Sequence, residues 1–198
     1  MKPFHIHAKT ISDAWFQLLF NVFDGDNTYR QQIQRGSFEK EQYRLQYPGI
    51  SVYIEYPHMD IVPVIPEGLK IPAPTTMDYI NDYFANYLMD PQLSENETYK
   101  YAGRMQHPLR AGDTQLERVI KMLRETPLTN QATIEIATPD DLEVCYGKDG
   151  KLDPPCLRLI DFKVIPIDGQ HLLSVNVFFR SWDLWAGLPS NLGGIELL

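Results

Sequence analysis

The side chains with the clearest chemical potential stand near the C-terminal end of the sequence. Cys156 follows two prolines in DPPC, and Arg180 and Ser181 open the later stretch RSWDLWAGLPSN. A thiol beside a cation ionises more readily and becomes a nucleophile. An arginine and a serine hydroxyl at a strand end can together bind a phosphate. These residues are compatible with a nucleophile beside an anion site, although, taken alone, a buried thiol and an ordinary strand end are the simpler explanation of the same residue types.

The remainder of RSWDLWAGLPSN carries polar groups suited to a nitrogenous base. The side-chain amide of Asn191 has both a donor and an acceptor, so it can pair with the edge of a uracil ring. Asp183 offers a carboxylate, and Gly187 stands where the chain is expected to turn before a helix. The alternative is that these polar residues only form the turn and cap that helix.

Periodicity predicts the elements that position these residues. Apolar residues at helical spacing predict helices within 12–25, 76–90 and 113–125, and Thr114 with Glu117 is typical of a capping box. Alternation predicts strands within 49–57 and 132–138, and an antiparallel pair, 157–166 and 171–180, on either side of the turn IDGQ. This order indicates one α+β domain over residues 1–198, with a large mixed, mainly antiparallel sheet and helices packed on one face. A second subunit is the expected cover for the other face.

Composition narrows the class of protein. The chain has 198 residues, 43% of them hydrophobic, and a net charge of −8. An acidic chain of this kind disfavours nucleic acid and acidic membranes as partners. No apolar run reaches the roughly 18 residues of a membrane helix, and MKPFHIHAKT lacks the apolar core of a signal peptide. The sequence has only two cysteines, Cys145 and Cys156, so we expect a cytoplasmic protein without a disulfide framework. His5 and His7 have no third metal ligand near them in sequence, so we expect no metal site.

The combination of Pro-Pro-Cys with RSWDLWAGLPSN resembles the thymidylate synthase family, whose pattern is Pro-Pro-Cys followed by Arg-Ser-x-Asp-x-x-x-Gly-Leu-Pro-x-Asn. The resemblance covers residues 110–198 clearly. Upstream, IEYP, IPEGLKIP and TMDYINDYF are loosely similar to short, archaeal-type members. The resemblance implies a thymidylate synthase-like fold and a homodimer. It also implies a methyltransferase that converts dUMP to dTMP with 5,10-methylenetetrahydrofolate as co-substrate, without a metal.

The family pattern also implies a role for each matching residue. Cys156 would add to C6 of the pyrimidine, and Tyr101, in KYAGRM, would lie near it, unless it is an ordinary core or surface tyrosine. Asn191 favours uracil, since the cytosine-acting hydroxymethylases carry aspartate there. The implied sets are catalytic residues Cys156, Asp183 and Tyr101, substrate-binding residues Arg180, Ser181 and Asn191, and folate-binding residues Asp183 and Gly187.

Several positions depart from the family pattern. Leu157 replaces a frequent histidine, and Phe179 replaces the usual glutamine. Asn130 and Gln131 stand where the family has an arginine pair that serves the partner's phosphate site, and Arg104 or Arg110 are candidate replacements. The family's glutamate acid has no recognisable counterpart, which leaves Asp78 or Asp82 as substitutes. Cys145 is expected to be a structural thiol.

Three functions are compatible with these observations. The leading one is methylation of dUMP, and a pyrimidine nucleotide hydroxymethylase would use the same covalent chemistry. A non-catalytic paralogue that keeps the fold is the third, favoured by the departures above. The family pattern normally continues past the position of Leu198 into a helix and a His-x-Tyr strand, so we expect either a truncated chain or a site without that part.

Overall fold

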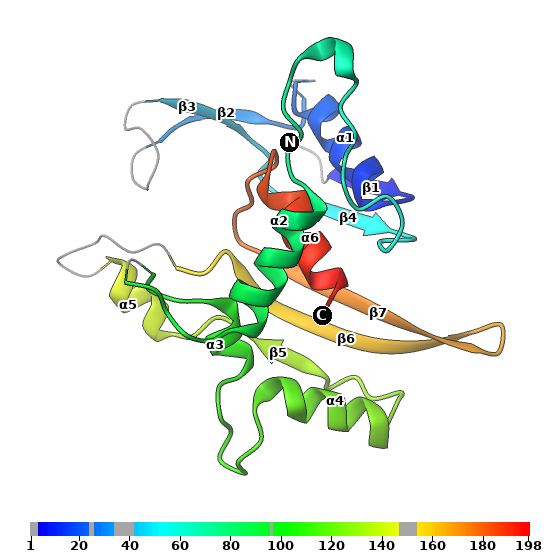
Figure 1. Ribbon diagram of the computed structural model, residues 1–198, viewed down its shortest axis with the longest axis vertical. Coiled ribbons are helices and arrows are strands. Elements are labelled where there is room, and N and C mark those ends of the chain that lie inside the picture. The colour runs from blue at the N-terminus through cyan, green and yellow to red at the C-terminus, as the bar shows by residue number, and fades with distance from the viewer. Residues whose placement is uncertain (1–3, 24–25, 34–41, 96, 147–153) are drawn as a thin grey trace. The chain divides into compact units, whose positions relative to one another are not determined.

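The computed structural model in Figure 1 describes residues 4–23, 26–33, 42–95, 97–146 and 154–198. The chain divides into two compact units. The first unit comprises residues 1–85 and 183–198, and the second comprises residues 86–182.

The first unit combines two short strand pairs with helices. Strand β1 (Phe4–Ala8) pairs in parallel with β4 (Ile50–Ile54), and β2 (Tyr29–Gln32) pairs antiparallel with β3 (Tyr43–Gln46). The helical segments are α1 (Ile11–Val22), a 3-10 turn (Glu67–Leu69), α2 (Met77–Tyr83) and α6 (Gly187–Glu196). A π-helical segment, Phe84–Met89, follows α2 in the chain, and its residues 86–89 belong to the second unit.

Local sequence explains these helices. The hydroxyl of Thr10 accepts a hydrogen bond from the Asp13 amide at 3.1 Å and so caps α1. The residues of α1 that are buried recur every three or four positions, as for one helical face: Ile11, Ala14, Trp15, Leu18 and Val22. Helix α6 packs on α2, where Gly193 is needed because a Cβ there would lie 2.9 Å from Ile80 Cδ1. The predicted helices at 12–25 and 76–90 are confirmed.

The second unit holds the two long strands. Its elements are α3 (Tyr101–Met105), α4 (Gln115–Glu125), β5 (Thr133–Glu135), α5 (Asp140–Tyr146), β6 (Leu157–Ile167) and β7 (Gln170–Phe179). The sheet order is β5-β6-β7, with both pairs antiparallel. Asp168 and Gly169 form the two-residue turn between β6 and β7 with positive φ of 49° and 77°, which suits the right-handed twist of a hairpin. The predicted hairpin is confirmed.

The α+β class and the mainly antiparallel pairing are confirmed. Over the described residues the strands pair in three sheets, β1-β4, β2-β3 and β5-β6-β7, where one large sheet was expected. Alternation identifies strands but not their partners, because pairing depends on contacts distant in sequence. That residues 1–198 form a single domain stays a prediction. None of the helices in the described ranges is long and apolar enough to cross a membrane.

Candidate active site

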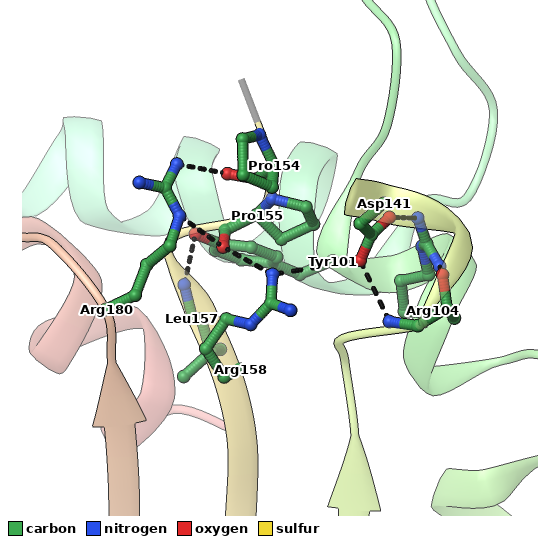
Figure 2. Close-up of polar contacts among 9 residues, drawn as sticks. Tyr101, Arg104, Asp141, Pro154, Pro155, Leu157, Arg158 and Arg180 are labelled. Carbon is green, nitrogen blue, oxygen red and sulfur yellow. Dashed lines mark hydrogen bonds and ion pairs between the residues drawn. The ribbon is translucent and has the colours of Figure 1, made fainter. Parts of the chain in front are cut away.

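The segment that carries Cys156 leads directly into β6. Pro155 and Leu157 are fully buried, whereas Cys156 between them is partly exposed. Because the proline rings fix φ and remove two N–H donors, the backbone of residues 154 and 155 has only carbonyl groups to offer. Arg180, directly after β7, donates hydrogen bonds to both of these carbonyls (Figure 2). Its Nε donates to the Pro155 carbonyl at 3.2 Å and its Nη2 to the Pro154 carbonyl at 2.5 Å.

The backbone of Arg180 also contacts the cysteine. Its amide donates to the Cys156 carbonyl at 2.9 Å. The family pattern places an arginine near the nucleophile, and here the guanidinium and amide of one residue contact three consecutive backbone carbonyls. Arg180 therefore determines how the cysteine segment enters the strand.

Tyr101, on α3, contacts the same segment from the other side of the cysteine. Its hydroxyl accepts a hydrogen bond from the Leu157 amide at 3.2 Å. Burial raises the pKa of the Tyr101 phenol well above its usual range, and the nearby Cys156 raises it further, while Arg180 lowers it. The phenol is therefore protonated at neutral pH and able to donate one hydrogen bond. The expected proximity of Tyr101 to Cys156 is found, and its catalytic role stays a prediction.

Sequence reasoning missed the residues that surround this segment. Asp141, at the start of α5, is buried and accepts a hydrogen bond from Arg104 Nη2 at 2.5 Å. Arg104 also donates to Thr138 Oγ1 at 3.0 Å, so it is engaged inside the unit, whereas it was considered as a replacement phosphate ligand. Arg158 Nη1 donates to the Pro155 carbonyl at 3.3 Å and lies 3.8 Å from Asp141 Oδ2. The sequence carried no local signal for these contacts, since β6 also contains the charged residues Asp161 and Lys163.

Asp183, in the first unit, caps helix α6. Its Oδ2 accepts from the Ala186 and Gly187 amides at 3.0 and 2.8 Å, and its Oδ1 accepts from the Trp185 amide at 3.3 Å. A Cβ at Gly187 would lie 3.0 Å from Asp183 Cβ, so glycine permits this close approach. An ionised carboxylate has about four acceptor positions, so within the described residues these three hydrogen bonds leave one position on Oδ1.

The predicted site residues fall in both units. Cys156, Tyr101, Arg180 and Ser181 belong to the second unit, and Asp183, Gly187 and Asn191 to the first. Within the second unit the structure brings Cys156, Tyr101 and Arg180 together. Asn191 lies half-buried in α6.

The departures from the family pattern have partial explanations. Phe179 stacks on Trp182 with ring centroids 3.9 Å apart, so its side chain packs against an aromatic ring. Asn130 and Gln131, which stand where the family has an arginine pair, are exposed. Asp78 and Asp82, the candidates for the family's glutamate acid, are exposed as well. The side chain of Cys145 lies outside the described residues. In the described part of the chain, His, Cys, Asp and Glu form no group of three that would hold a metal.

Sequence comparison identifies relatives along almost the whole chain, although no family model matches it. A protein of Methanosarcina acetivorans named "Putative thymidylate synthase" is 30% identical over 196 residues, which are 98% of this chain and 77% of that protein. A protein of the same name from Methanosarcina mazei is 29% identical over 195 residues, again 98% of this chain and 77% of the relative.

Structural comparison supports the same fold. The thermostable thymidylate synthase A from Bacillus subtilis superposes with a TM-score of 0.56 and 11% sequence identity. The match covers 96% of this chain and 71% of the other. At this identity the match establishes the architecture, and the expected α+β fold is confirmed by it.

Proposed function

The chain belongs to the thymidylate synthase family, and we propose that it is a methyltransferase that converts dUMP to dTMP with 5,10-methylenetetrahydrofolate. The observation that carries this proposal is the set of three contacts from Arg180 to the backbone of residues 154, 155 and 156. These contacts hold a permanent cation at the backbone of the segment that carries Cys156, which supports the proposal because a cation near a cysteine thiol activates it as a nucleophile.

Cys156 is proposed to add to C6 of the uracil ring through its sulfur. Bond formation at C6 moves electron density to C5, which then forms the new carbon–carbon bond. Loss of the C5 proton and departure of the Cys156 thiolate from C6 follow, so the enzyme thiolate is recovered. The folate would supply the one-carbon unit, whose carbon–nitrogen bonds to the folate break, and the hydride that reduces this unit to a methyl group, so that dihydrofolate is released.

Arg180 is proposed to have two roles. A guanidinium carries five N–H donors, and two of them contact the proline carbonyls. Within the described residues the other three are proposed to bind an anion such as the phosphate of dUMP, with the hydroxyl of Ser181 beside them in sequence. The Tyr101 hydroxyl, held protonated by burial, accepts from the Leu157 amide, and we propose that it offers its own proton to the substrate on that side of the cysteine.

The residues of helix α6 and its cap are assigned to the base and the folate. Asn191 is proposed to pair with N3 and O4 of uracil, because one amide supplies the required donor and acceptor. Asp183 and Gly187 are proposed to contact the folate, supported by the acceptor position left on Asp183 Oδ1. The proposed assembly is a homodimer that covers an apolar sheet face.

Release of tritium from C5-labelled dUMP tests the chemistry, because exchange at C5 requires prior addition at C6. We expect release by the 198-residue chain with methylenetetrahydrofolate, and loss of release in Cys156→Ala. Cys145→Ala is the matched control and is expected to retain release. Formation of dihydrofolate then distinguishes methylation from hydroxymethylation.

Mass spectrometry after incubation with fluoro-dUMP and methylenetetrahydrofolate provides an independent measurement. A covalent complex that maps to Cys156 supports the proposal. Absence of both the complex and tritium release, in protein shown to be folded, would favour a non-catalytic paralogue. Release without dihydrofolate would favour the hydroxymethylase.

A further inference from the structure

Arg158 occupies an irregular position in the sheet. The pairing of β6 with β7 changes register between Leu157 and Leu159, so Arg158 is the extra residue of a β-bulge. Its carbonyl accepts hydrogen bonds from the Ile136 and Ala137 amides, both at 3.0 Å. A bulge redirects the side chain of the inserted residue. Here the side chain extends to the carbonyl of Pro155 and to Asp141, as Figure 2 shows.

The side chain of Arg158 is held between these two acceptors. It is 19% exposed, and Asp141 is 6% exposed. Asp141 is fixed in turn, because it also accepts from Arg104 Nη2 and from the Thr138 amide at 2.9 Å. The carboxylate of Asp141 therefore contacts the guanidinium groups of both Arg104 and Arg158. Arg158 connects this carboxylate to the segment that carries Cys156.

The carbonyl of Pro155 is the point that Arg158 shares with Arg180. Arg158 Nη1 and Arg180 Nε donate to it at 3.3 and 3.2 Å. The proline ring fixes φ of residue 155, and the peptide bond that follows is planar. The angle ψ of Pro155 is therefore the soft rotation that sets the direction of its carbonyl and of the Cys156 amide in the same peptide plane. Two donors on that carbonyl hold this rotation.

We propose that Arg158 is a positioning residue for Cys156: together with Arg180 it clamps the Pro155 carbonyl, and Asp141 and Arg104 hold it in place. The reactivity of the thiol then depends on a residue that need not touch the substrate. This inference rests on the proposed function in that Cys156 is taken as the nucleophile. It is tested without dUMP, so its failure can be distinguished from failure of the proposed reaction.

The experiment measures the rate of alkylation of Cys156 by iodoacetamide as a function of pH. Cys145→Ala is the background for every protein, so that Cys156 is the only thiol. Arg158→Met removes both charge and donor, Arg158→Gln keeps a donor, and Arg158→Lys keeps both. Arg118→Met is the matched control, because it removes an arginine of the same unit whose ion pair is with Asp113. Urea unfolding of each variant gives its stability.

We expect Arg158→Met to react about tenfold more slowly at neutral pH, with the alkylation profile displaced by about one pH unit to higher values. Arg158→Lys should restore most of the rate, because one nitrogen, Nη1, makes both recorded contacts. Arg158→Gln should lie between them. Arg118→Met should match the background protein.

Wild-type alkylation profiles in folded Arg158→Met and Arg158→Gln would overturn the proposal and leave Arg158 with a purely structural role. If Arg158→Met does not fold, the comparison of Arg158→Gln with Arg158→Lys decides. Equal alkylation profiles for Arg158→Gln and Arg158→Lys, both at the rate of the Cys145→Ala background protein, would also overturn the proposal.

Discussion

The residues on both sides of Cys156 are held through their backbones by side chains from elsewhere in the second unit. Arg180 contacts the carbonyls before the cysteine, and Tyr101 contacts the amide after it. These contacts connect segments 25 and 56 residues apart in sequence. The thiol is therefore placed by a framework that substrate binding does not have to create, which is what preorganised reactivity requires.

Tyr101→Phe tests the contact at Leu157. The substitution removes the acceptor of a buried amide, and an unsatisfied buried donor costs about 1–3 kcal/mol. We expect the free energy of unfolding in urea to fall by that amount and the Leu157 amide to exchange hydrogen faster. Tyr79→Phe is the control, because Tyr79 is exposed and its loss of a hydroxyl should change neither measurement. Equal exchange at Leu157 in both variants would contradict the assigned contact.

Among the elements, helix α4 shows how a local signal and a distant contact combine. The predicted capping box is present: the Glu117 amide donates to Thr114 Oγ1 at 3.2 Å, and the Thr114 amide donates to Glu117 Oε2 at 2.8 Å. The side chain of Gln115 then bonds to both backbone groups of Glu135 in β5. The cap determines where the helix begins, and Gln115 attaches that beginning to the sheet.

The capping box gives α4 a predictable pH dependence. The hydrogen bond from the Thr114 amide, and then that from its hydroxyl, hold the pKa of Glu117 below its ordinary value of 4.5. Because the pKa of Glu117 is lower in the folded state, its ionised carboxylate stabilises that state at pH values above the ordinary pKa of 4.5. This contribution to the free energy of unfolding disappears as the pH falls through the lowered pKa of the folded state. We expect Glu117→Gln to be less stable than wild type at neutral pH and the difference to vanish between about pH 5 and pH 3.

Urea unfolding across that range measures the effect. Glu125→Gln serves as the control. It removes the same charge from the C-terminal end of α4, whereas the unpaired backbone amides of a helix lie at its N-terminal end. A stability difference for Glu117→Gln that does not change with pH would show that the charge of Glu117 does not contribute.

At the scale of the whole molecule, the hairpin of β6 and β7 exposes apolar side chains that water does not favour. On one face Leu173 and Val175 are 57% and 39% exposed, and Leu173 lies opposite Val164. Alternation puts Leu172, 48% exposed, on the opposite face. The proposed homodimer would cover the face of Leu173 and Val175, since exposed apolar side chains of this kind are typical of subunit contacts.

Leu173→Glu is expected to convert the dimer to a monomer, because it would bury two unpaired carboxylates at a two-fold interface. Sedimentation velocity at several protein concentrations measures the mass. Leu172→Glu introduces the same charge one residue away on the other face and is expected to leave the dimer intact. A wild-type chain that sediments as a monomer throughout would refute the homodimer.

Many local features of this protein's structure follow from short-range properties of its sequence. Helices, the Asp168–Gly169 turn and the capping box depend on residues within a few positions of one another, so periodicity and turn chemistry predict them. Pro-Pro-Cys with RSWDLWAGLPSN indicates the family, because that combination of residue types and spacing is specific. The candidate nucleophile and its arginine were predicted for the same reason.

The tertiary structure alone decided which strands pair and which side chains hold the cysteine. Arg104, Asp141 and Arg158 come from α3, α5 and β6, and the ion pair between the first two spans 37 residues. None of the three carries a local pattern, since an arginine or aspartate has the same propensity whether it faces solvent or a buried partner. Such contacts form only once the backbone has brought distant segments together, and the bulge at Arg158 that directs its side chain arises from the pairing itself.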